Sequence, residues 1–541
     1  MNPLPEETLA RHLGELLGQL GAILSPELTV ALEAVCGAAS RGDLCVKVTE
    51  NEQIAALLGS GVVGRAGEFK PLILDGVRLY LHRLWSYEKA AGDAVASRLG
   101  EAPPVDEARL AQGLDRFFGD DTGDLQRRAA EMAVRQRLAI ITGGPGTGKT
   151  RTILAILMLL MGQSLEKPPR LALVAPTGKA AARMRESIAR VFAELALPEE
   201  LASQIPTNAQ TIHRLLRDAS RVDFLPLDGV IVDEASMVDV GLLSRLVRVL
   251  PESARLILIG DRSQLASVEA GAVLGDLCGS ITGNAPIARH IVELRKSRRF
   301  KEDSGILALS DAVKAGDADA ALGILEDEKF PDVAAELPSK VSDLLREKAV
   351  RHFREVYASD DVVTALKKLD RFRVLCAVRQ GSFGVERVNL AMEALLDVDG
   401  EWFHGRPILV TENDYSLNLF NGETGIVWRD ATVGRELRVF FPGETDGSVR
   451  RFLPSSLPPH ETAFAMTVHR SQGSEFDEVL TILPPKDTPL LTRELLYTAI
   501  TRAKTRVTLA AAPAVLRLAI ERRVERMSGL RDRFWKSDDA P

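Results

Sequence analysis

One glycine-rich segment has the residue types and the spacing of a triphosphate-binding loop. It reads Gly143-Gly144-Pro145-Gly146-Thr147-Gly148-Lys149-Thr150 and follows the apolar run 138–141. Glycines let backbone N–H groups close around phosphate oxygens, and the N-terminus of a following helix adds partial positive charge. Lys149 would reach the β- and γ-phosphates, while the hydroxyl of Thr150 would hold Mg²⁺. The segment therefore predicts a site for ATP and Mg²⁺. The alternative interpretation is a glycine-rich turn with a purely structural role.

Polar residues after two further apolar runs could complete this site. Asp233 and Glu234 follow the run 230–232, and Gln264 comes shortly after the run 256–259. Asp233 would support the Mg²⁺, and Glu234 would orient and deprotonate an attacking water. Gln264 would sense the γ-phosphate. Such residues are usually solvated strand ends or capping groups, but their combination with the phosphate loop favours catalysis.

Two arginines could stabilise the charge that spreads over a transferring phosphoryl group. Arg299 follows the apolar run 291–294, and Arg502 lies within the segment 497–504. The planar guanidinium group suits this task. Most of the 68 Lys and Arg residues must be solvated surface, so spacing alone would not select these two.

Hydroxyl and imidazole side chains after other predicted strands could contact a nucleic-acid backbone. The candidates are Pro176, Thr177, Thr211, His213, Thr467 and His469. Hydroxyls, amides and exposed loop N–H groups bind phosphates without reading sequence. Either histidine could instead be an ordinary buried or capping residue. Phe383 and Phe420 are weaker candidates for stacking on bases, because most phenylalanines lie in protein cores.

The alternation of apolar runs with helical stretches predicts an α/β fold. Parallel sheets covered by helices give this texture, and it occurs in two blocks of the chain. The first 100 residues show mainly helical spacing, and the turn-rich stretch 425–453 has the pattern of antiparallel strands. We therefore expect a helical N-terminal domain (1–103), a parallel-sheet domain with the phosphate loop (104–285) and a second parallel-sheet domain (286–541), with a small β-barrel inserted at about 415–462.

Composition limits the class of protein. The 541 residues include 45% hydrophobic and 26% charged residues, which is typical of a globular chain with several cores. The net charge of −7 excludes a generally basic surface but allows a local basic groove. Four scattered cysteines disfavour a disulfide framework or a zinc site, and no apolar run is long enough to span a membrane. We expect a cytoplasmic protein with no membrane partner.

The ordered set of motifs resembles the superfamily 1 DNA helicases, and within them the RecD family of exodeoxyribonuclease V alpha subunits. The shared segments are GGPGTGKT (143–150), APTGKAAARM (175–184), TIHRLL (211–216), VDEASMVD (232–239), GDRSQL (260–265), AMTVHRSQGSEF (465–476) and LLYTAITRAK (495–504). Three segments resemble RecD more narrowly: LYLHRLWSYE (79–88), FRVLCAVRQGSFGVERVN (372–389) and LNLFNGETGIV (417–427). The likeness runs from about residue 77 to about residue 510.

The resemblance implies that the two parallel-sheet domains are RecA-like and that the inserted β-barrel is SH3-like. It also implies an ATP-driven motor that moves 5′→3′ on DNA. It implies binding of single-stranded and tailed double-stranded DNA, and assembly with RecB-like and RecC-like subunits for double-strand-break repair. Gln126 matches the adenine-contacting glutamine of these helicases. Arg299 and Arg502 match their γ-phosphate arginines, with the adjacent Arg298 as a fallback, and we expect both arginines to come from the second domain.

Other functions stay open at this point. A free-standing RecD-like helicase or a relaxase-linked helicase domain would share the motifs, although the segment 79–88 and the N-terminal region favour a subunit that docks on partners. An ATP-switched scaffold that never translocates would be expected to lack the water-activating acid or an arginine, yet Glu234, Arg299 and Arg502 are present. No cluster of acids with a nearby lysine stands outside the motor motifs, so we expect nuclease activity only in an assembled complex.

Overall fold

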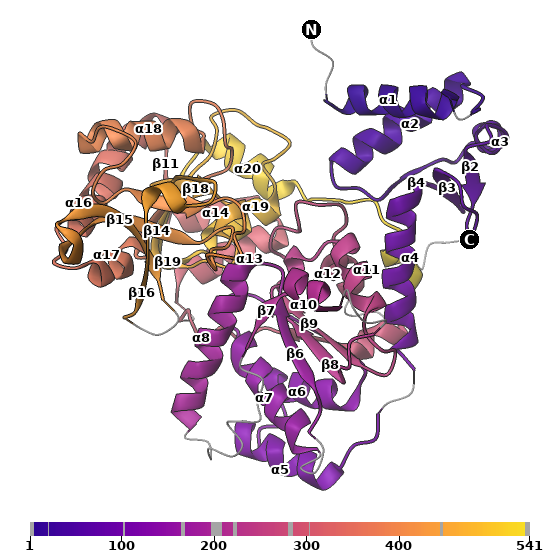
Figure 1. Ribbon diagram of the computed structural model, residues 1–541, viewed down its shortest axis with the longest axis horizontal. Helices are drawn as coiled ribbons and strands as arrows, with labels where there is room; N and C mark the ends of the chain where they lie inside the picture. Colours follow the sequence, from indigo (N-terminus) through magenta and orange to yellow (C-terminus); the bar gives the residue numbers. More distant parts are fainter. Residues whose placement is uncertain are drawn as a thin grey trace.

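Two parallel sheets, each covered by helices, make up most of the protein in a computed structural model (Figure 1). The structure describes residues 5–19, 21–100, 103–163, 168–195, 208–219, 224–279, 285–301, 303–443 and 447–535. A small N-terminal module lies beside the first parallel sheet, and an antiparallel sheet is inserted in the second domain. Within the described residues, no helix is long and apolar enough to cross a membrane.

The first parallel sheet has six strands in the order β10-β5-β9-β8-β6-β7. They are β5 (Leu138–Gly143), β6 (Leu171–Ala175), β7 (Gln210–Thr211), β8 (Gly229–Val232), β9 (Arg255–Gly260) and β10 (Ile291–Leu294). The helices of this domain are α5 (Glu107–Phe118), α6 (Leu125–Arg135), α7 (Lys149–Gly162), α8 (Gly178–Leu195), α10 (Ile212–Ala219), α11 (Val240–Arg248) and α12 (Val273–Cys278). Every residue of β5 and β8 is buried, because helices cover both faces of a parallel sheet. The predicted strands of the first block are confirmed.

The second parallel sheet has five strands in the order β11-β20-β19-β12-β18. They are β11 (Val333–Glu336), β12 (Phe372–Cys376), β18 (Ala465–Thr467), β19 (Phe476–Ile482) and β20 (Ala503–Ala510). Its helices include α13 (Gly305–Ala315), α14 (Ala318–Glu326), the π-helix η4 (Leu345–Val350), α16 (Arg351–Tyr357), α17 (Val362–Leu369), α18 (Val385–Leu396), α19 (Arg493–Ile500) and α20 (Pro513–Glu521). The prediction of two parallel-sheet α/β domains is therefore confirmed.

The inserted module is an antiparallel sheet of five strands in the order β16-β15-β14-β13-β17. The strands are β13 (Pro407–Val410), β14 (Thr424–Asp430), β15 (Glu436–Pro442), β16 (Val449–Phe452) and β17 (His460–Thr462). The first four strands follow each other as neighbours, and the fifth returns beside the first. The insertion begins with β13, earlier than the expected residue 415, because the apolar run of that strand carries no alternation that separates it from a parallel strand.

The N-terminal region, which we expected to be mainly helical, also contains a small sheet that the sequence did not indicate. The helices α1 (Pro5–Gln19), α2 (Pro26–Ser40), α3 (Asn51–Gly59) and α4 (His82–Ser97) accompany a sheet of four strands. Its order is β1-β4-β3-β2, with β1 (Cys45–Lys47), β2 (Val63–Arg65), β3 (Leu72–Asp75) and β4 (Arg78–Leu81). Strands of three or four residues are too short to show alternation, and the helical spacing from residue 77 to residue 84 spans the junction of β4 with α4.

Two expected domain boundaries also need correction. The strand β10 pairs with β5, so the first domain extends beyond the expected end at residue 285. The segment 522–535, which we call the C-terminal strap, leaves the second domain after α20 and returns to the first (Figure 1). Leu530, Phe534 and Trp535 of this strap belong to the core that surrounds the first sheet. Both placements depend on pairing partners far away in the sequence, which no local pattern reveals.

Candidate functional site

The glycine-rich loop joins the end of β5 to the start of α7 and is closely packed on both sides. Gly146 and Gly148 have φ angles of 73° and 83°, which side-chain-bearing residues rarely adopt. A Cβ on Gly146 would lie 2.3 Å from the Cβ of Arg299, and one on Gly148 would lie 2.1 Å from Nε2 of Gln126. Only glycine fits at these two positions, and two predicted site residues lie directly against the loop.

Lys149 lies inside this loop. Its Nζ donates hydrogen bonds to the carbonyl oxygens of Gly143 at 2.8 Å and Gly144 at 3.1 Å. Thr150 is half-buried in the first turn of α7, next to Lys149. The ammonium group and the helix N-terminus thus bring positive charge to one place, as a phosphate site requires.

Gln126 is fixed against the loop from the side of α6. Asp124 caps this helix by accepting from the backbone N–H of Gln126, at 2.7 Å. The Nε2 of Gln126 donates to the carbonyl of Thr147 at 2.8 Å, and its Oε1 is buried without a partner. An unpaired buried acceptor is costly, and the amino group of an adenine base would satisfy this one.

The two predicted catalytic acids follow β8 at the same edge of the sheet as the loop. Burial and the neighbouring charge of Glu234 raise the pKa of Asp233. Glu234 has a φ angle of 50°, and its backbone N–H donates to Oδ1 of Asp233 at 2.9 Å. Left-handed backbone at a residue with a side chain is strained, and such strain gathers at functional sites.

The segment after β9 links the two domains. Asp261 accepts hydrogen bonds from Nε2 of Gln264 at 3.1 Å and from the hydroxyl of Tyr497 at 2.9 Å. Tyr497 lies on α19 of the second domain and is 3% exposed. Sequence reasoning missed this tyrosine, because a lone Tyr in an apolar helix is usually only a core residue.

Arg502 lies between α19 and β20 and is 4% exposed. Its Nη1 donates to the carbonyl of Ser474 at 3.1 Å and its Nε to that of Thr498 at 3.2 Å. Burial lowers the pKa of Arg502, while the charges of Glu234 and Glu475 act in the opposite direction. The charge of Glu234, which follows β8 of the first domain, therefore acts on Arg502 of the second domain.

Arg299 does not come from the second domain, contrary to expectation. It follows β10, the edge strand of the first sheet, on the connector to the second domain. Ser297 Oγ donates to the carbonyl of Pro145 at 3.2 Å, and the backbone N–H of Arg298 donates to that of Gly146 at 2.8 Å. The guanidinium of Arg299 forms an ion pair with Glu475. The connector is thus fastened to the loop by contacts between residues 152 positions apart in the chain, which spacing cannot reveal.

Arg298, the fallback for Arg299, points elsewhere. Its Nη2 lies 3.7 Å from Oδ2 of Asp124, and its side chain is 47% exposed. Asp124 caps α6, so Arg298 lies toward the Gln126 side of the loop. Of the two arginines, Arg299 is the less exposed, with 20% of its side chain accessible, and it lies against the loop.

Three of the predicted nucleic-acid threonines share one local structure. Their Oγ1 atoms accept from the backbone N–H three residues later: Thr177 from Ala180 at 3.2 Å, Thr211 from Arg214 at 3.1 Å and Thr467 from Arg470 at 3.3 Å. Each lies at the carboxyl end of a strand, namely β6, β7 and β18. Ala175 pairs with Thr211, so Pro176, Thr177 and Thr211 lie together at one edge of the first sheet, while Thr467 lies in the second domain.

The two histidines differ in their surroundings. His213 is exposed on α10, so it is not a core histidine, and His469 is half-buried after β18. Burial lowers the pKa of both, with help from Arg245 for His213 and from Arg526 for His469. Both imidazoles are therefore mainly neutral near pH 7 and can donate or accept a hydrogen bond.

The two phenylalanines that were candidates for base stacking also lie in different surroundings. Phe383 packs against the core of the second domain. Phe420, on the β13–β14 loop, lies on the first domain, since a Cβ on Gly178 would be 2.3 Å from its Cγ. On the same loop, Tyr415 stands 5.9 Å from the Phe420 ring and 4.9 Å from the guanidinium of Arg217. This loop therefore covers the segment that holds Pro176 and Thr177.

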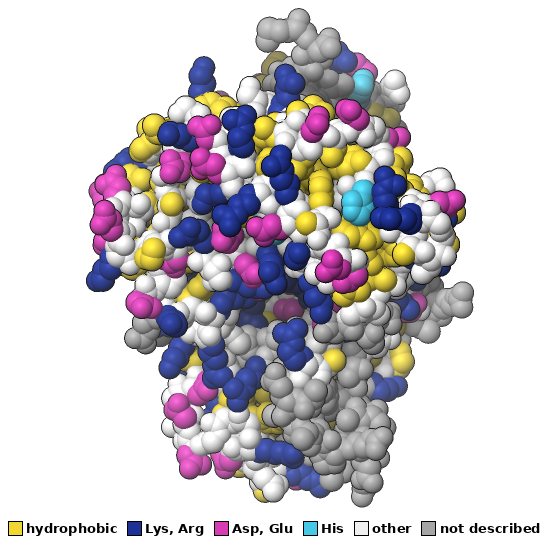
Figure 2. Space-filling view, turned by 90° about the vertical axis from the view of Figure 1, so that its left-hand side faces the viewer, with side chains coloured by type: hydrophobic (Ala, Val, Ile, Leu, Met, Phe, Trp, Pro, Cys, Tyr) yellow, Lys and Arg dark blue, Asp and Glu magenta, His cyan; other side chains and the backbone are white. Residues whose placement is uncertain are grey.

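A groove of about 610 Å³ lies between α8 and the inserted sheet. The basic side chains that line it are Lys179, Arg183, Arg185 and Arg450. Figure 2 shows Lys and Arg side chains gathered around a hollow at the centre of this face. Burial lowers the pKa of Lys179 to about 8. The lining also includes the acids Glu186, Asp370 and Glu423, and Arg450 forms an ion pair with Glu423, so basic side chains exceed acidic ones in this groove only slightly.

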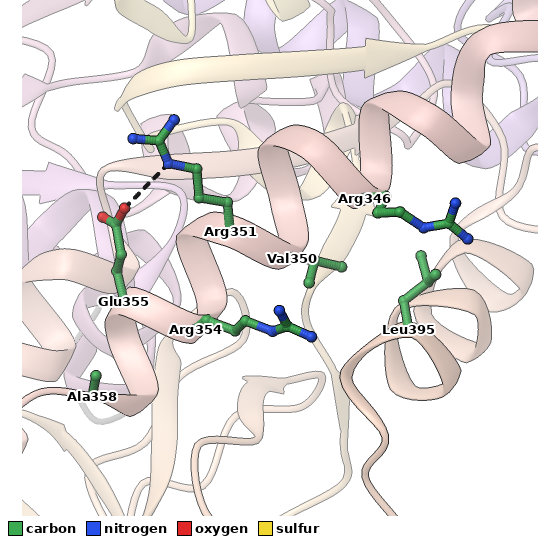
Figure 3. Close-up of a pocket in the computed structure, with 7 residues that line it drawn as sticks. All are labelled: Arg346, Val350, Arg351, Arg354, Glu355, Ala358 and Leu395. Carbon is green, nitrogen blue, oxygen red and sulfur yellow. Dashed lines mark ion pairs between the residues drawn. The ribbon is translucent and has the colours of Figure 1, made fainter.

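A second, shallow pocket of about 550 Å³ lies apart from these residues. It is lined by η4 and α16 on one side and Leu395 of α18 on the other (Figure 3). Arg346 and Arg354 point into the space near Leu395, whereas Arg351 pairs with Glu355 at 3.5 Å. None of the predicted site residues lines this pocket.

Known proteins are similar in sequence to this chain over most of its length. A family model described as an AAA domain matches residues 122–334, and one described as a UvrD-like helicase C-terminal domain matches residues 462–510. The chain is 40% identical over 501 residues to "RecBCD enzyme subunit RecD" of Mycolicibacterium smegmatis, covering 89% of this chain and 86% of that one. It is 42% identical over 483 residues to the subunit of the same name from Mycobacterium tuberculosis, covering 85% and 81%.

A further relative is more distant. The chain is 30% identical over 467 residues to the "ATP-dependent RecD2 DNA helicase" of Deinococcus radiodurans. The match covers 83% of this chain but 57% of that protein.

Proposed function

This chain belongs to the RecD family, and we propose that it is the ATP-driven DNA helicase subunit of a RecBCD-type complex. In that role it would translocate 5′→3′ on DNA during double-strand-break repair by homologous recombination. The two RecD subunits described above match more than 80% of their own length. The comparison therefore concerns the whole motor and not one shared domain.

The proposed roles of the site residues follow from their chemistry. Lys149 and the N–H groups of the loop 143–150 bind the triphosphate, and Gln126 contacts the adenine. Thr150 and Asp233 hold Mg²⁺, Glu234 activates water, Gln264 senses the γ-phosphate, and Arg299 and Arg502 contact the transferring group. Pro176, Thr177, Thr211, His213, Thr467 and His469 contact the DNA backbone.

One observation carries the assignment of ATP hydrolysis. The two domains meet beside the site residues, because Tyr497 on α19 of the second domain donates to Asp261 of the first at 2.9 Å. Arg502 is bonded to the carbonyl of Thr498 on the same helix. The charge of Glu234 in the first domain also acts on Arg502. A water-activating acid and an arginine finger belong to one reaction only if they share a cleft. Their common cleft supports a motor whose two domains meet around ATP.

The Mg²⁺ ligands fit the chemistry of that ion. A carboxylate and a hydroxyl oxygen are ligands that Mg²⁺ accepts, together with phosphate oxygens. Asp233 lies beside a second acid, Glu234, and burial disfavours its charged form, so a bound cation would relieve both costs. When bound, Mg²⁺ neutralises charge that develops on the phosphates.

The residues of the chain would divide the hydrolysis step among them. The Nζ of Lys149 would exchange the carbonyls of Gly143 and Gly144 for phosphate oxygens. The carboxylate of Glu234 would orient the attacking water and take its proton. Arg502 would approach the γ-phosphoryl oxygens from the second domain and stabilise the charge that spreads over them.

The DNA track would cross both domains. Thr177 and Thr211 lie on the first domain and Thr467 on the second, so opening and closing of the cleft would change the distance between two phosphate grips. Alternating grips of this kind convert hydrolysis into steps along a strand. The basic groove beside α8 would attract the strand, with an affinity that falls as the salt concentration rises.

We also propose the domain roles that the sequence suggested. The N-terminal module would dock on RecB-like and RecC-like subunits, in the cytoplasm. The inserted sheet would be an SH3-like barrel, since its order of four consecutive strands with the fifth beside the first is the order of that fold. Its β13–β14 loop would help to hold the DNA strand over the first domain.

The test combines purification with unwinding. We expect the chain to co-purify with RecB-like and RecC-like subunits from its native host. The complex should unwind duplexes with 5′ tails through this subunit, and Lys149→Ala should abolish the unwinding of 5′-tailed duplexes. The control is the same complex carrying a substitution at the exposed Arg351, outside the motor cleft.

Two other readings would give different results. A free-standing helicase would purify alone and unwind DNA without partners. An ATP-switched scaffold would bind DNA and hydrolyse ATP without moving along a strand. A wild-type chain that neither hydrolyses ATP nor unwinds any tailed duplex, alone or in complex, would remove the helicase assignment.

A further inference from the structure

Tyr497 of the second domain touches both phosphate-sensing segments of the first. Its hydroxyl donates to Oδ2 of Asp261 at 2.9 Å. A Cβ added at Gly144 would lie 3.1 Å from the hydroxyl oxygen of Tyr497, so the phenol group packs against the glycine-rich loop. Burial and the charge of Asp261 raise the pKa of Tyr497 well above its ordinary value, so the hydroxyl stays protonated.

Asp261 is the shared acceptor of this contact. It is 3% exposed, and its Oδ1 accepts from the backbone N–H of Ser263 at 3.0 Å. Its Oδ2 accepts from both Tyr497 and Nε2 of Gln264, the latter at 3.1 Å. Two donors on one oxygen weaken each other, so removal of one strengthens the bond to the other.

The adjoining residue also docks on the second domain. The backbone N–H of Leu265 donates to Oγ1 of Thr498 at 2.9 Å. The carbonyl of Leu265 accepts from Nε2 of Gln472 at 2.8 Å. Segment 261–265 is thus fastened to the second domain by three side chains, two of which are neighbours on α19.

The helix α19 connects this contact with Arg502. The carbonyl of Thr498 accepts from Nε of Arg502 at 3.2 Å. The carbonyl of Tyr497 accepts from the hydroxyl of Thr501 at 2.8 Å. A shift of Tyr497 therefore moves the end of the helix to which the guanidinium is bonded.

We propose that Tyr497 is a positioning residue that couples γ-phosphate sensing by Gln264 to the placement of Arg502. When the γ-phosphate takes the Gln264 amide, Oδ2 of Asp261 is left to Tyr497, and the stronger bond draws α19 toward the phosphate. Without the hydroxyl of Tyr497, ATP would bind, but the guanidinium of Arg502 would be misplaced. The proposal rests on the ATP-hydrolysing function proposed above and assigns a further residue to it.

The test replaces only the hydroxyl. Tyr497→Phe keeps the buried ring, and we expect the DNA-stimulated kcat to fall by about 10- to 100-fold, because small misplacements of reacting groups cost this much. The KM for ATP should change by less than about threefold, since Lys149 and the loop are untouched. The matched control is Tyr80→Phe, which removes another buried hydroxyl that donates to a carboxylate, Glu88, at 2.9 Å in the N-terminal module.

A double-mutant cycle identifies the path. Asp261→Asn should lower kcat to a similar extent, and the double variant with Tyr497→Phe should be no worse than the more impaired single variant. Additive losses would show that the two residues act separately and would overturn the coupling. If Tyr497→Phe and Tyr80→Phe lower Tm alike and neither lowers kcat, the hydroxyl of Tyr497 is merely structural.

The same experiment separates this proposal from the function on which it depends. A wild-type chain with DNA-stimulated ATP turnover that Lys149→Ala abolishes establishes the hydrolysis, whatever Tyr497→Phe does. A wild-type chain without such turnover overturns the function and the positioning role together. A rise in KM with unchanged kcat would assign Tyr497 to ATP binding and would contradict the coupling.

Discussion

Arg299 and Glu475 form an ion pair that joins the connector after the first sheet to the second domain. Nη2 of Arg299 takes part in this pair, while its Nη1 is buried without a partner. Burial works against a charged Glu475, but Arg299 and Arg183 outweigh it and hold the pKa of Glu475 at about 2. One side of the guanidinium is thus held by the second domain, and the other has a buried donor with no partner, which suits the role proposed for Arg299.

We expect Glu475→Gln to slow ATP hydrolysis by about tenfold, because a charge-assisted hydrogen bond that orients Arg299 is lost. The lowered pKa of Glu475 means that the pair stabilises the fold above the ordinary value of 4.5 and that this stability is lost as pH falls toward 2. Urea unfolding at several acidic pH values should therefore show a flatter pH dependence for Glu475→Gln. If the unfolding free energy of Glu475→Gln varies with acidic pH as that of the wild type does, the lowered pKa of Glu475 is contradicted.

Arg502→Ala should abolish ATP turnover while ATP still binds. An arginine finger contributes about 10³- to 10⁵-fold in rate in related reactions. Steady-state hydrolysis and nucleotide-binding measurements on the same preparation check this. Because Arg502 is buried and bonded to two carbonyls, circular dichroism must show that the variant is folded, and Arg502→Lys serves as the charge-retaining comparison. A folded Arg502→Ala protein with unchanged ATPase removes the finger assignment.

Phe420→Ala should weaken binding of single-stranded DNA by about tenfold, because base–aromatic stacking contributes about 1–3 kcal/mol. Phe383→Ala is the matched control, since that ring packs against the core of the second domain. It should lower stability and leave DNA affinity unchanged. Fluorescence anisotropy with a labelled oligonucleotide at fixed salt distinguishes them. Equal DNA affinities for both variants would assign Phe420 to packing on Gly178 alone.

Asp276→Asn should stabilise the protein in alkaline solution. Asp276 is 8% exposed, its Oδ2 has no partner, and burial raises its pKa to about 7. A raised pKa of an acid means that its contribution is fully present below the ordinary value of 3.8 and is lost as pH rises through 7. The variant should gain about 1–4 kcal/mol over wild type at pH 8 and much less at pH 5. A gain that is equal at both pH values would contradict the shift.

Arg526→Ala should loosen the C-terminal strap. Its guanidinium donates to the carbonyls of Ser267, Glu269 and Gly271, each at 2.8 Å. Loss of these bonds should lower the free energy of unfolding by about 2–4 kcal/mol. Arg523→Ala, at an exposed position of the same strap, should change it by less than about 0.5 kcal/mol. Equal effects of the two substitutions in urea unfolding would show that the strap contacts are not stabilising.

Local patterns predicted much of the first-domain site. The glycine-rich loop, Asp233 and Glu234 each follow a buried apolar run, and the ends of parallel strands meet at one edge of a sheet. Neighbouring strands therefore bring these residues together once the fold class is known. The shared pattern of Thr177, Thr211 and Thr467 could be predicted for the same reason, although not their identical capping bonds.

The sequence by itself determined the two parallel-sheet domains and the kinds of residue that surround the phosphate loop, because strand periodicity and glycine spacing are local properties. Only the tertiary structure decided that Arg299 stands on the first domain's connector, that Tyr497 reaches Asp261 and that the strap returns to the first core. These contacts join residues that are far apart in the chain. Their geometry depends on how two domains pack, and side-chain spacing along one segment carries no information about that packing.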